Sequence, residues 1–308
     1  MINRTLGRPE SKVMVTLYRA SPGAMNPVAS VVSGPDGSFR FEQAVTGPHL
    51  LQAIYAGVVY NQMLPQQPSS GRVEVAVYEP TTDPKIVQLT QHFVLLEPIE
   101  SALHVSETVL VNNPANRVLV GSHNPVRFYV PGERRGEPRL SIVGPQGVPV
   151  DRPLIPTNKK NVYTVDFPLR PGETRLDLSY VVELGPERSF TVRNVQEAGV
   201  PLRVIAPLGV TLHSDRLEAI AQEPQTLATV YELRGREARV TIQGSGSLRL
   251  ASESESRGPG LQEKPPRLYR RLAAVLALMS AMLALAFVWV FRRGLHASQL
   301  PATQKSSR

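Results

Sequence analysis

The feature that most limits the fold is a period-two alternation of apolar and polar residues, which recurs throughout residues 1–250. Successive side chains of a β-strand point to opposite faces, so this alternation is typical of strands that bury one face only. Turn residues interrupt it about every eight to fifteen positions, a spacing that predicts an all-β fold of sandwiches or barrels. The clearest segments are Val13, Val15 and Leu17; Val73, Val75 and Val77; Val126, Phe128 and Val130; and Leu176, Leu178, Tyr180 and Val182.

Proline and glycine mark the expected turns. The chain has 28 prolines, about twice the usual share. A proline inside a central strand removes a ladder hydrogen bond, so we expect these residues at edges and turns. The sequences GPDG at 34–37, GPQG at 144–147 and PGE at 171–173 are expected to reverse the chain.

One soluble segment, residues 215–223, has a helix-like pattern. Asp215 and Glu218 have the spacing of a capping box, and Leu217 and Ile220 could share a helix face. Strand-like sequences, GVTLH and TLATVYEL, flank the segment on both sides. We therefore favour a strand or an irregular connection there.

The soluble portion is longer than one ordinary sandwich, so tandem β-sandwich modules are expected. A polar, Pro-bounded stretch at 79–84 and the sequence GPE at 185–187 are the candidate boundaries. The expected organisation is a first sandwich at 1–80, a second at 85–183, a third small module or a continuation of the second at 187–250, a flexible linker at 251–266, a transmembrane helix with basic flanks at 267–293 and a polar tail at 294–308.

An uncharged apolar run begins at Leu272 and ends at Phe291, and Ser280 is its only polar residue. At about 1.5 Å per helical residue, its length is about 30 Å, which matches the hydrocarbon core of a bilayer. Trp289 lies near one end of the run, where aromatic residues meet the headgroups. The run predicts a single transmembrane anchor, with a basic flank of Arg267, Arg270 and Arg271 before it and of Arg292 and Arg293 after it.

The net charge of +8 belongs mostly to these flanks. From Ala251 onward there are nine Lys or Arg residues and three Glu, so residues 1–250 carry only about two positive charges. Basic flanks attract anionic lipid headgroups. The charge therefore indicates a lipid bilayer as partner and does not indicate nucleic acid.

The side of the membrane is less constrained. The two flanks are nearly equal in positive charge, and the sequence opens MINRTLGRPE without an apolar signal core. The absence of cysteine excludes disulfides and thiolate metal sites on either side. By itself, this pattern describes a tail-anchored protein that faces the cytosol.

Residues 5–65 carry a family resemblance. They contain GRP, the strand VMVTLYR, GPDGSFRFE at 34–42, GPHLLQAIYAG at 47–57 and VVYNQMLP at 58–65. These segments resemble the carboxypeptidase regulatory-like family of small transthyretin-like or CnaB-like sandwiches. Its strongest element is a hairpin at 36–41, with Phe39 and Phe41 as core residues. The resemblance implies a fold and carries no catalytic residue.

The same resemblance bears on location. The region through about residue 200 looks like the β-rich part that accompanies this module in uncharacterised bacterial membrane proteins. Such domains are mostly extracytoplasmic and begin with a strand for which only residues 1–3 remain here. We therefore expect a single-pass protein of the bacterial cell membrane, with its bulk outside, a short cytoplasmic tail and a gene start, with signal peptide, upstream of Met1.

A search for chemistry returns no catalytic, cofactor or metal site. The histidines form no HxH or HExxH pattern, and GxSxG and SxxK are absent. His92 and His104 lie in strand patterns, where a satisfied or exposed polar position is the expectation. Asp36 beside Gly37 is expected to be a turn residue and no calcium ligand, since the ligand ladder is missing. The six histidines are His49, His92, His104, His123, His213 and His296.

Three further features of the sequence are weaker signals. CnaB-like domains sometimes contain an isopeptide bond, for which Lys12, Asn61 and Glu42 are nominal candidates. Asn3-Arg4-Thr5 matches the glycosylation triplet, a pattern that often arises by chance. A small exposed surface around Tyr55, Tyr60 and Met63 could dock a partner.

The best hypothesis is a non-enzymatic, membrane-anchored β-sandwich protein that presents an interaction surface to a protein or glycan ligand. A second reading is an accessory or structural subunit of an envelope complex, with helix contacts through Ala277, Ala281 and Ala284. A third is a hydrolase whose site is built from scattered residues. That reading requires a cleft in which a histidine at 92, 104 or 123 meets a carboxylate.

Overall fold

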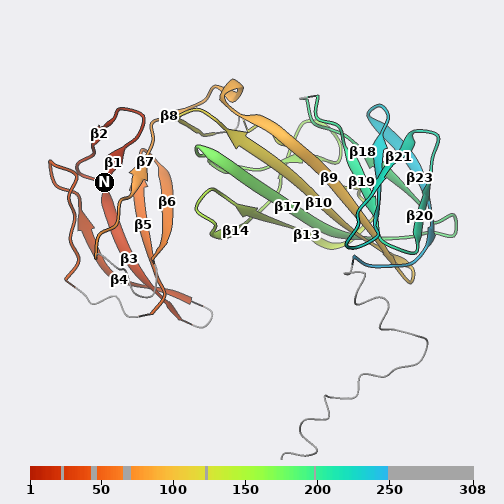
Figure 1. Ribbon diagram of the computed structural model, residues 1–308, viewed down its shortest axis with the longest axis horizontal. Coiled ribbons are helices and arrows are strands. Elements are labelled where there is room, and N and C mark those ends of the chain that lie inside the picture. Colours follow the sequence, from red (N-terminus) through yellow and green to blue (C-terminus); the bar gives the residue numbers. More distant parts are fainter. Residues whose placement is uncertain (22–23, 43–46, 65–70, 122–123, 198, 249–308) are drawn as a thin grey trace, which may run out of the picture. The chain divides into compact units, whose positions relative to one another are not determined.

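The computed structural model describes residues 1–21, 24–42, 47–64, 71–121, 124–197 and 199–248 (Figure 1). These residues form strands in several sheets and contain no α-helix, so the expected all-β class is confirmed. Their one helical element is a short 3-10 turn, η1 (Pro84–Ile86), which Asp83 caps by accepting a hydrogen bond from the Lys85 amide at 3.0 Å. The expected linker, transmembrane helix and tail lie outside the described residues.

The N-terminal lobe, residues 1–78, consists of two sheets that share one hydrophobic core. The larger sheet is antiparallel, in the order β4-β3-β5-β6, and comprises β3 (Met14–Ser21), β4 (Ala24–Val32), β5 (His49–Tyr55) and β6 (Val58–Leu64). The smaller sheet, in the order β2-β1-β7, comprises β1 (Ile2–Asn3), β2 (Arg8–Pro9) and β7 (Ala76–Val77).

Alternation explains which side chains fill this core. Val15 and Leu17 of β3 are buried and pack with Leu51 of β5, whereas Met14, directly before Val15, is exposed. A register slip of one residue would turn the whole buried set outward, so the alternation also specifies the pairing. The first residues of the sequence are part of the lobe, because Ile2 pairs in parallel with Ala76. An upstream gene start stays a prediction.

The turn predicted at 34–37 is present. The Gly37 amide donates to the Gly34 carbonyl at 2.9 Å, and the Asp36 carboxylate accepts hydrogen bonds from Ser38. Gly37 has φ +72°, and an added Cβ would lie 2.3 Å from the Met1 carbonyl oxygen, so only glycine fits. The prediction of a hairpin strand after this turn is wrong, because residues 38–42 form no strand. Phe39 and Phe41 pack edge to face against each other, with ring centroids 6.1 Å apart, and contact the core from irregular backbone.

The second lobe, residues 85–248, is built on an eight-stranded sheet in the order β14-β13-β17-β10-β9-β19-β22-β21. Its long strands lie side by side in Figure 1. Only the pair formed by β19 and β9 is parallel. The strands are β9 (Gln88–Ile99), β10 (Ala102–Asn113), β13 (Arg134–Val143), β14 (Pro149–Arg152), β17 (Gly172–Glu183), β19 (Arg203–Ala206), β21 (Leu217–Gln222) and β22 (Thr229–Leu233).

Two three-stranded sheets share the hydrophobic core of this eight-stranded sheet. Strands from 85–183 and from 187–248 therefore contribute to one sheet and one core. The first small sheet comprises β12 (Phe128–Tyr129), β16 (Val162–Thr164) and β15 (Ile155–Pro156); the second comprises β18 (Ser189–Arg193), β23 (Glu237–Gly244) and β20 (Val210–His213). A further parallel pair joins β8 (Pro80–Thr81) to β11 (Val118–Leu119).

Two local expectations in this lobe are confirmed. The segment 215–223 contains β21 and no helix, because its residues pair with β22 along the edge of the eight-stranded sheet. The GPQG sequence at 144–147 joins β13 to β14, with a hydrogen bond of 2.9 Å from the Gly147 amide to the Gly144 carbonyl.

Candidate functional site

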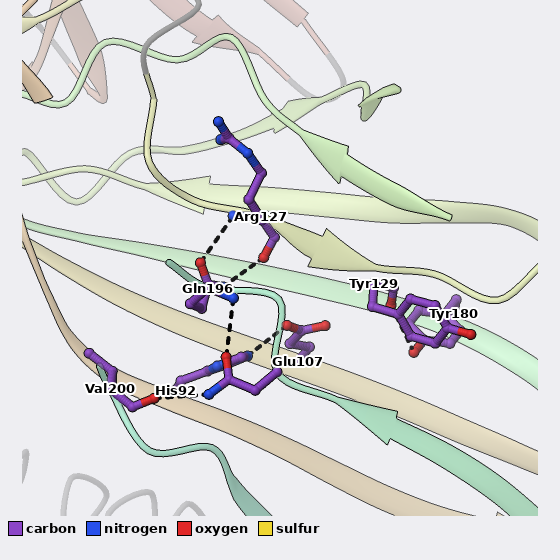
Figure 2. A network of polar contacts seen from close by, with 8 residues as sticks. His92, Glu107, Arg127, Tyr129, Tyr180, Gln196 and Val200 are labelled. Carbon is purple, nitrogen blue, oxygen red and sulfur yellow. Dashed lines mark hydrogen bonds and ion pairs between the residues drawn. The ribbon is translucent and has the colours of Figure 1, made fainter. Parts of the chain in front are cut away.

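A histidine and a carboxylate meet in the core of the second lobe. His92 on β9 and Glu107 on β10 occupy the buried phase of their strands, and His92 Nε2 lies 2.7 Å from Glu107 Oε1 (Figure 2). The residues are 1% and 4% exposed. Because a carboxylate oxygen accepts hydrogen bonds, Nε2 is the donor in this contact, and Nδ1 of His92 is buried without a partner among the described residues.

A hydrolase site would need a histidine and a carboxylate that meet in a cleft, and the His92–Glu107 pair meets only the first of these two requirements. The distance is suitable for a base and its orienting carboxylate, but both groups are enclosed in the core, where a substrate has no access. His104 lies on the outer face of the sheet, opposite Glu97, and no hydrogen bond joins the two described side chains. His123 and His296 lie outside the described residues.

A nearby tyrosine shares the environment of Glu107. Burial raises the pKa of Tyr180 well above its usual value of 10, and the negative charges of Glu107 and of ionised Tyr129 act in the same direction. The Tyr180 hydroxyl donates to the Tyr129 carbonyl at 3.4 Å. The phenol therefore stays protonated in the folded lobe and belongs to its structural core.

The outer face of the eight-stranded sheet carries a shallow depression of about 800 Å³. Both arginines that line it are paired with carboxylates. Arg139 contacts Asp151 at 2.9 Å, and Arg175 contacts Asp177 at 2.8 Å. Asp177 also accepts a hydrogen bond from Thr108 at 2.7 Å. Because both arginines are neutralised by these carboxylates, this surface is not expected to attract a charged ligand.

A second depression, of about 740 Å³, lies where the two small sheets of the second lobe meet. We call it the basic recess. Five cationic and two anionic side chains line it, together with smaller polar and apolar residues. Its lining residues are Arg127, Thr157, Asn158, Lys159, Lys160, Val162, Arg193, Asn194, Val195, Glu197, Arg236 and Glu237.

A short turn between β15 and β16 presents two of these cations. The Thr157 hydroxyl donates to the Val162 carbonyl at 2.8 Å and accepts from the Lys159 amide at 3.2 Å, which closes the turn. Asn161 completes it with φ +62°, a conformation that asparagine tolerates. Lys159 and Lys160 are exposed at the tip. The hydrogen bonds hold the backbone under both lysines.

Gln196 joins the two small sheets beneath the recess. It is 1% exposed, and its side-chain amide pairs with the backbone of Arg127 in both directions, at 3.1 and 2.6 Å (Figure 2). The Arg127 guanidinium points away from Gln196 and is held by the Val126 carbonyl at 2.9 Å and the Thr164 hydroxyl at 3.0 Å. An amide from one segment thus fixes an arginine on another.

The other arginines differ in their partners. Arg193 lies over the Tyr129 ring at 4.7 Å and pairs with Glu237 at 2.6 Å. Arg236 donates to the Gln196 carbonyl at 3.1 Å. Within the described part of the chain, four cations of the recess have no carboxylate partner, namely Arg127, Lys159, Lys160 and Arg236. Unpaired cations around a concave surface produce a positive potential that attracts anions.

A separate polar cluster closes the N-terminal lobe. Asn3 is fully buried, and its side-chain amide donates to Glu79 at 2.7 Å, Glu10 at 2.9 Å and Tyr55 at 3.1 Å. Hydrogen bonds from Tyr55 and Asn3 lower the pKa of Glu79, whereas burial, followed by the bond to Glu79, raises the pKa of Tyr55. The Asn3-Arg4-Thr5 triplet is therefore structural, because the amide that would be glycosylated is engaged.

Two sequence-based suggestions for the N-terminal lobe are wrong. Tyr60 is 1% exposed in the core and Met63 is 43% exposed on the other face, because residues three apart on a strand point to opposite sides. They form no common docking surface with Tyr55. Asn61 pairs with Gln52, which pairs with Thr16, so Asn61 lies two strands away from β3 and four residues along from the exposed Lys12, and the crosslink lacks its geometry.

The larger sheet of that lobe instead exposes an apolar row. Val32, Met14, Ile54 and Val59 are direct cross-strand neighbours on four adjacent strands. Each is between 40% and 60% exposed. Single exposed apolar residues are ordinary, but a contiguous row is typical of a contact surface.

No protein-family model matches this chain, and no curated protein matches it significantly. The resemblance to the carboxypeptidase regulatory-like family therefore stays a prediction. No group of three or more histidine, aspartate or glutamate side chains is arranged to hold a metal within the described ranges. Those ranges also contain no helix long and apolar enough to cross a bilayer, and Leu272, Ser280, Trp289, Phe291 and the arginine flanks lie outside them.

Proposed function

We propose that this chain is a non-enzymatic, membrane-anchored β-sandwich protein that binds an anionic partner at the basic recess. The observation that carries the proposal is the set of four recess cations without carboxylate partners. Rigid sheets hold the recess open, and the apolar run at 272–291 confines it to a membrane surface. Extracytoplasmic placement of the bulk, with a short cytoplasmic tail, is part of the proposal.

Binding of inorganic pyrophosphate tests the recess. The double variant Lys159→Gln/Lys160→Gln removes two exposed cations whose side chains make no structural bond, so the fold should be retained. We expect a loss of affinity of about tenfold, since each exposed ion pair contributes up to about 1 kcal/mol. Calorimetry on the full-length chain in non-ionic detergent measures it.

The matched control is Lys12→Gln/Lys85→Gln. It makes the same change in net charge at two exposed lysines outside the recess. Affinity within about twofold of wild type is expected for this control. An equal loss in both double variants would mean that pyrophosphate responds to net charge alone, and the recess would then be no binding site.

An accessory subunit of an envelope complex is the second candidate. The apolar row on the N-terminal sheet favours it, because an exposed contiguous apolar surface is typical of protein contacts. The recess favours the first candidate more strongly, because a buried amide holds the backbone of Arg127 and a closed turn holds the backbone of Lys159 and Lys160 before any ligand arrives.

A further inference from the structure

The number of recess cations without a carboxylate partner indicates a ligand with several charges. One small anion can neutralise one or two side chains, whereas four recess cations lack a carboxylate partner. A volume of about 740 Å³ lies in the range of sites that hold an organic ligand of some size. A polyanion that spans the recess would contact the turn at 157–160 on one side and Arg236 on the other.

The neutral side chains of the recess narrow the class of polyanion. The side-chain amide of Asn158 is exposed beside the cations, whereas the polar groups of Thr157 and Asn194, which also line the recess, are hydrogen-bonded to the backbone. Single-stranded nucleic acids are usually held by stacking of bases on aromatic rings, and none of the described lining residues is aromatic. Sugars that each carry hydroxyl groups and one carboxylate match this mixture of cations and hydrogen-bonding side chains.

The recess lies at one end of β23, and the chain leaves that strand at the other. Glu237 is the first residue of β23 and Arg236 directly precedes it, whereas Gly244 is the last. These eight residues span seven steps of about 3.4 Å, which place the two ends of the strand about 24 Å apart. The recess is therefore remote from the point at which the chain leaves β23.

We propose that the basic recess binds an acidic polysaccharide, with sugar carboxylates paired to Lys159, Lys160, Arg127 and Arg236; the inference rests on the recess being the binding site of the proposed function. Short oligogalacturonate is the probe, and its methyl ester, which has the same sugar chain without the charge, is the matched control ligand. Polyphosphate, polyglutamate and vesicles rich in phosphatidylglycerol form the competing arms.

The full-length chain in non-ionic detergent should bind oligogalacturonate and should not bind its methyl ester. Lys159→Gln/Lys160→Gln should weaken binding about tenfold, and Lys12→Gln/Lys85→Gln should leave it within about twofold. Polyphosphate, polyglutamate or the vesicles could instead bind in a way that depends on the two recess lysines, while oligogalacturonate does not. That result would overturn the polysaccharide proposal but would leave the recess as an anion-binding site. If none of these ligands binds differently to the two double variants, the polysaccharide proposal and the proposed function are both wrong.

Discussion

Replacement of Glu107 by leucine is expected to lower the free energy of unfolding by about 3 kcal/mol or more, because the variant leaves a buried donor without its acceptor. His92 Nε2 lies 2.7 Å from the carboxylate, and its Nδ1 already lacks a partner among the residues that the structure describes. The imidazole would therefore be buried with both nitrogens unpaired. Urea unfolding of the full-length chain in non-ionic detergent measures the loss.

The double variant His92→Leu/Glu107→Leu separates the contribution of the polar pair to stability from that of core packing. Replacing both members of a buried polar pair by apolar residues of similar volume is often neutral, so most of the lost stability should return. Glu183→Leu is the matched control, since this exposed glutamate pairs with Arg135 on the neighbouring strand and should cost less than about 1 kcal/mol. A double variant as unstable as Glu107→Leu would contradict the assignment of the pair.

The second large effect is a loss of stability at alkaline pH. Burial raises the pKa of Tyr60 to about 12, with its hydroxyl held between the amide and the carbonyl of Tyr78 at 3.1 Å. The unfolded phenol titrates near 10. Because the folded pKa is the higher one, the contribution of Tyr60 is fully present below about pH 10 and is lost as the pH rises through 12.

The expected loss from Tyr60 between pH 8 and pH 12 is about 2 kcal/mol. Tyr180 acts in the same direction, since burial raises its pKa as well. Urea unfolding at the two pH values, compared between wild type and Tyr60→Phe, isolates the contribution of the Tyr60 phenol. The variant should lose less stability on the alkaline side. An identical pH dependence of the two proteins would show that ionisation of Tyr60 is not coupled to folding.

Alternation in the sequence predicted the strands well where one face is buried. Val15 with Leu17 and Leu176 with Leu178 lie in the core as expected, because period two is a local property of the chain. Phe39 and Phe41 also alternate, yet they reach the core from irregular backbone. The pattern reports which face is buried and does not show whether a neighbouring strand is available for pairing.

The basic recess was not predicted from the sequence, because its residues are brought together by pairing between distant segments. Arg127 and Gln196 are 69 positions apart, and no local spacing links them. The His92–Glu107 pair left a signal that could have been used. Each residue stands in phase with the buried apolar residues of its strand, so two polar groups at core positions of adjacent long strands need a partner.

The most direct measurement of the central claim, a binding module held at a membrane, is alkaline carbonate extraction of cells that produce the chain. The account predicts that full-length protein stays in the membrane pellet, whereas a chain that ends at residue 250 is recovered in the supernatant, since it lacks the apolar run from Leu272 to Phe291. Release of the full-length protein into the supernatant would contradict the account.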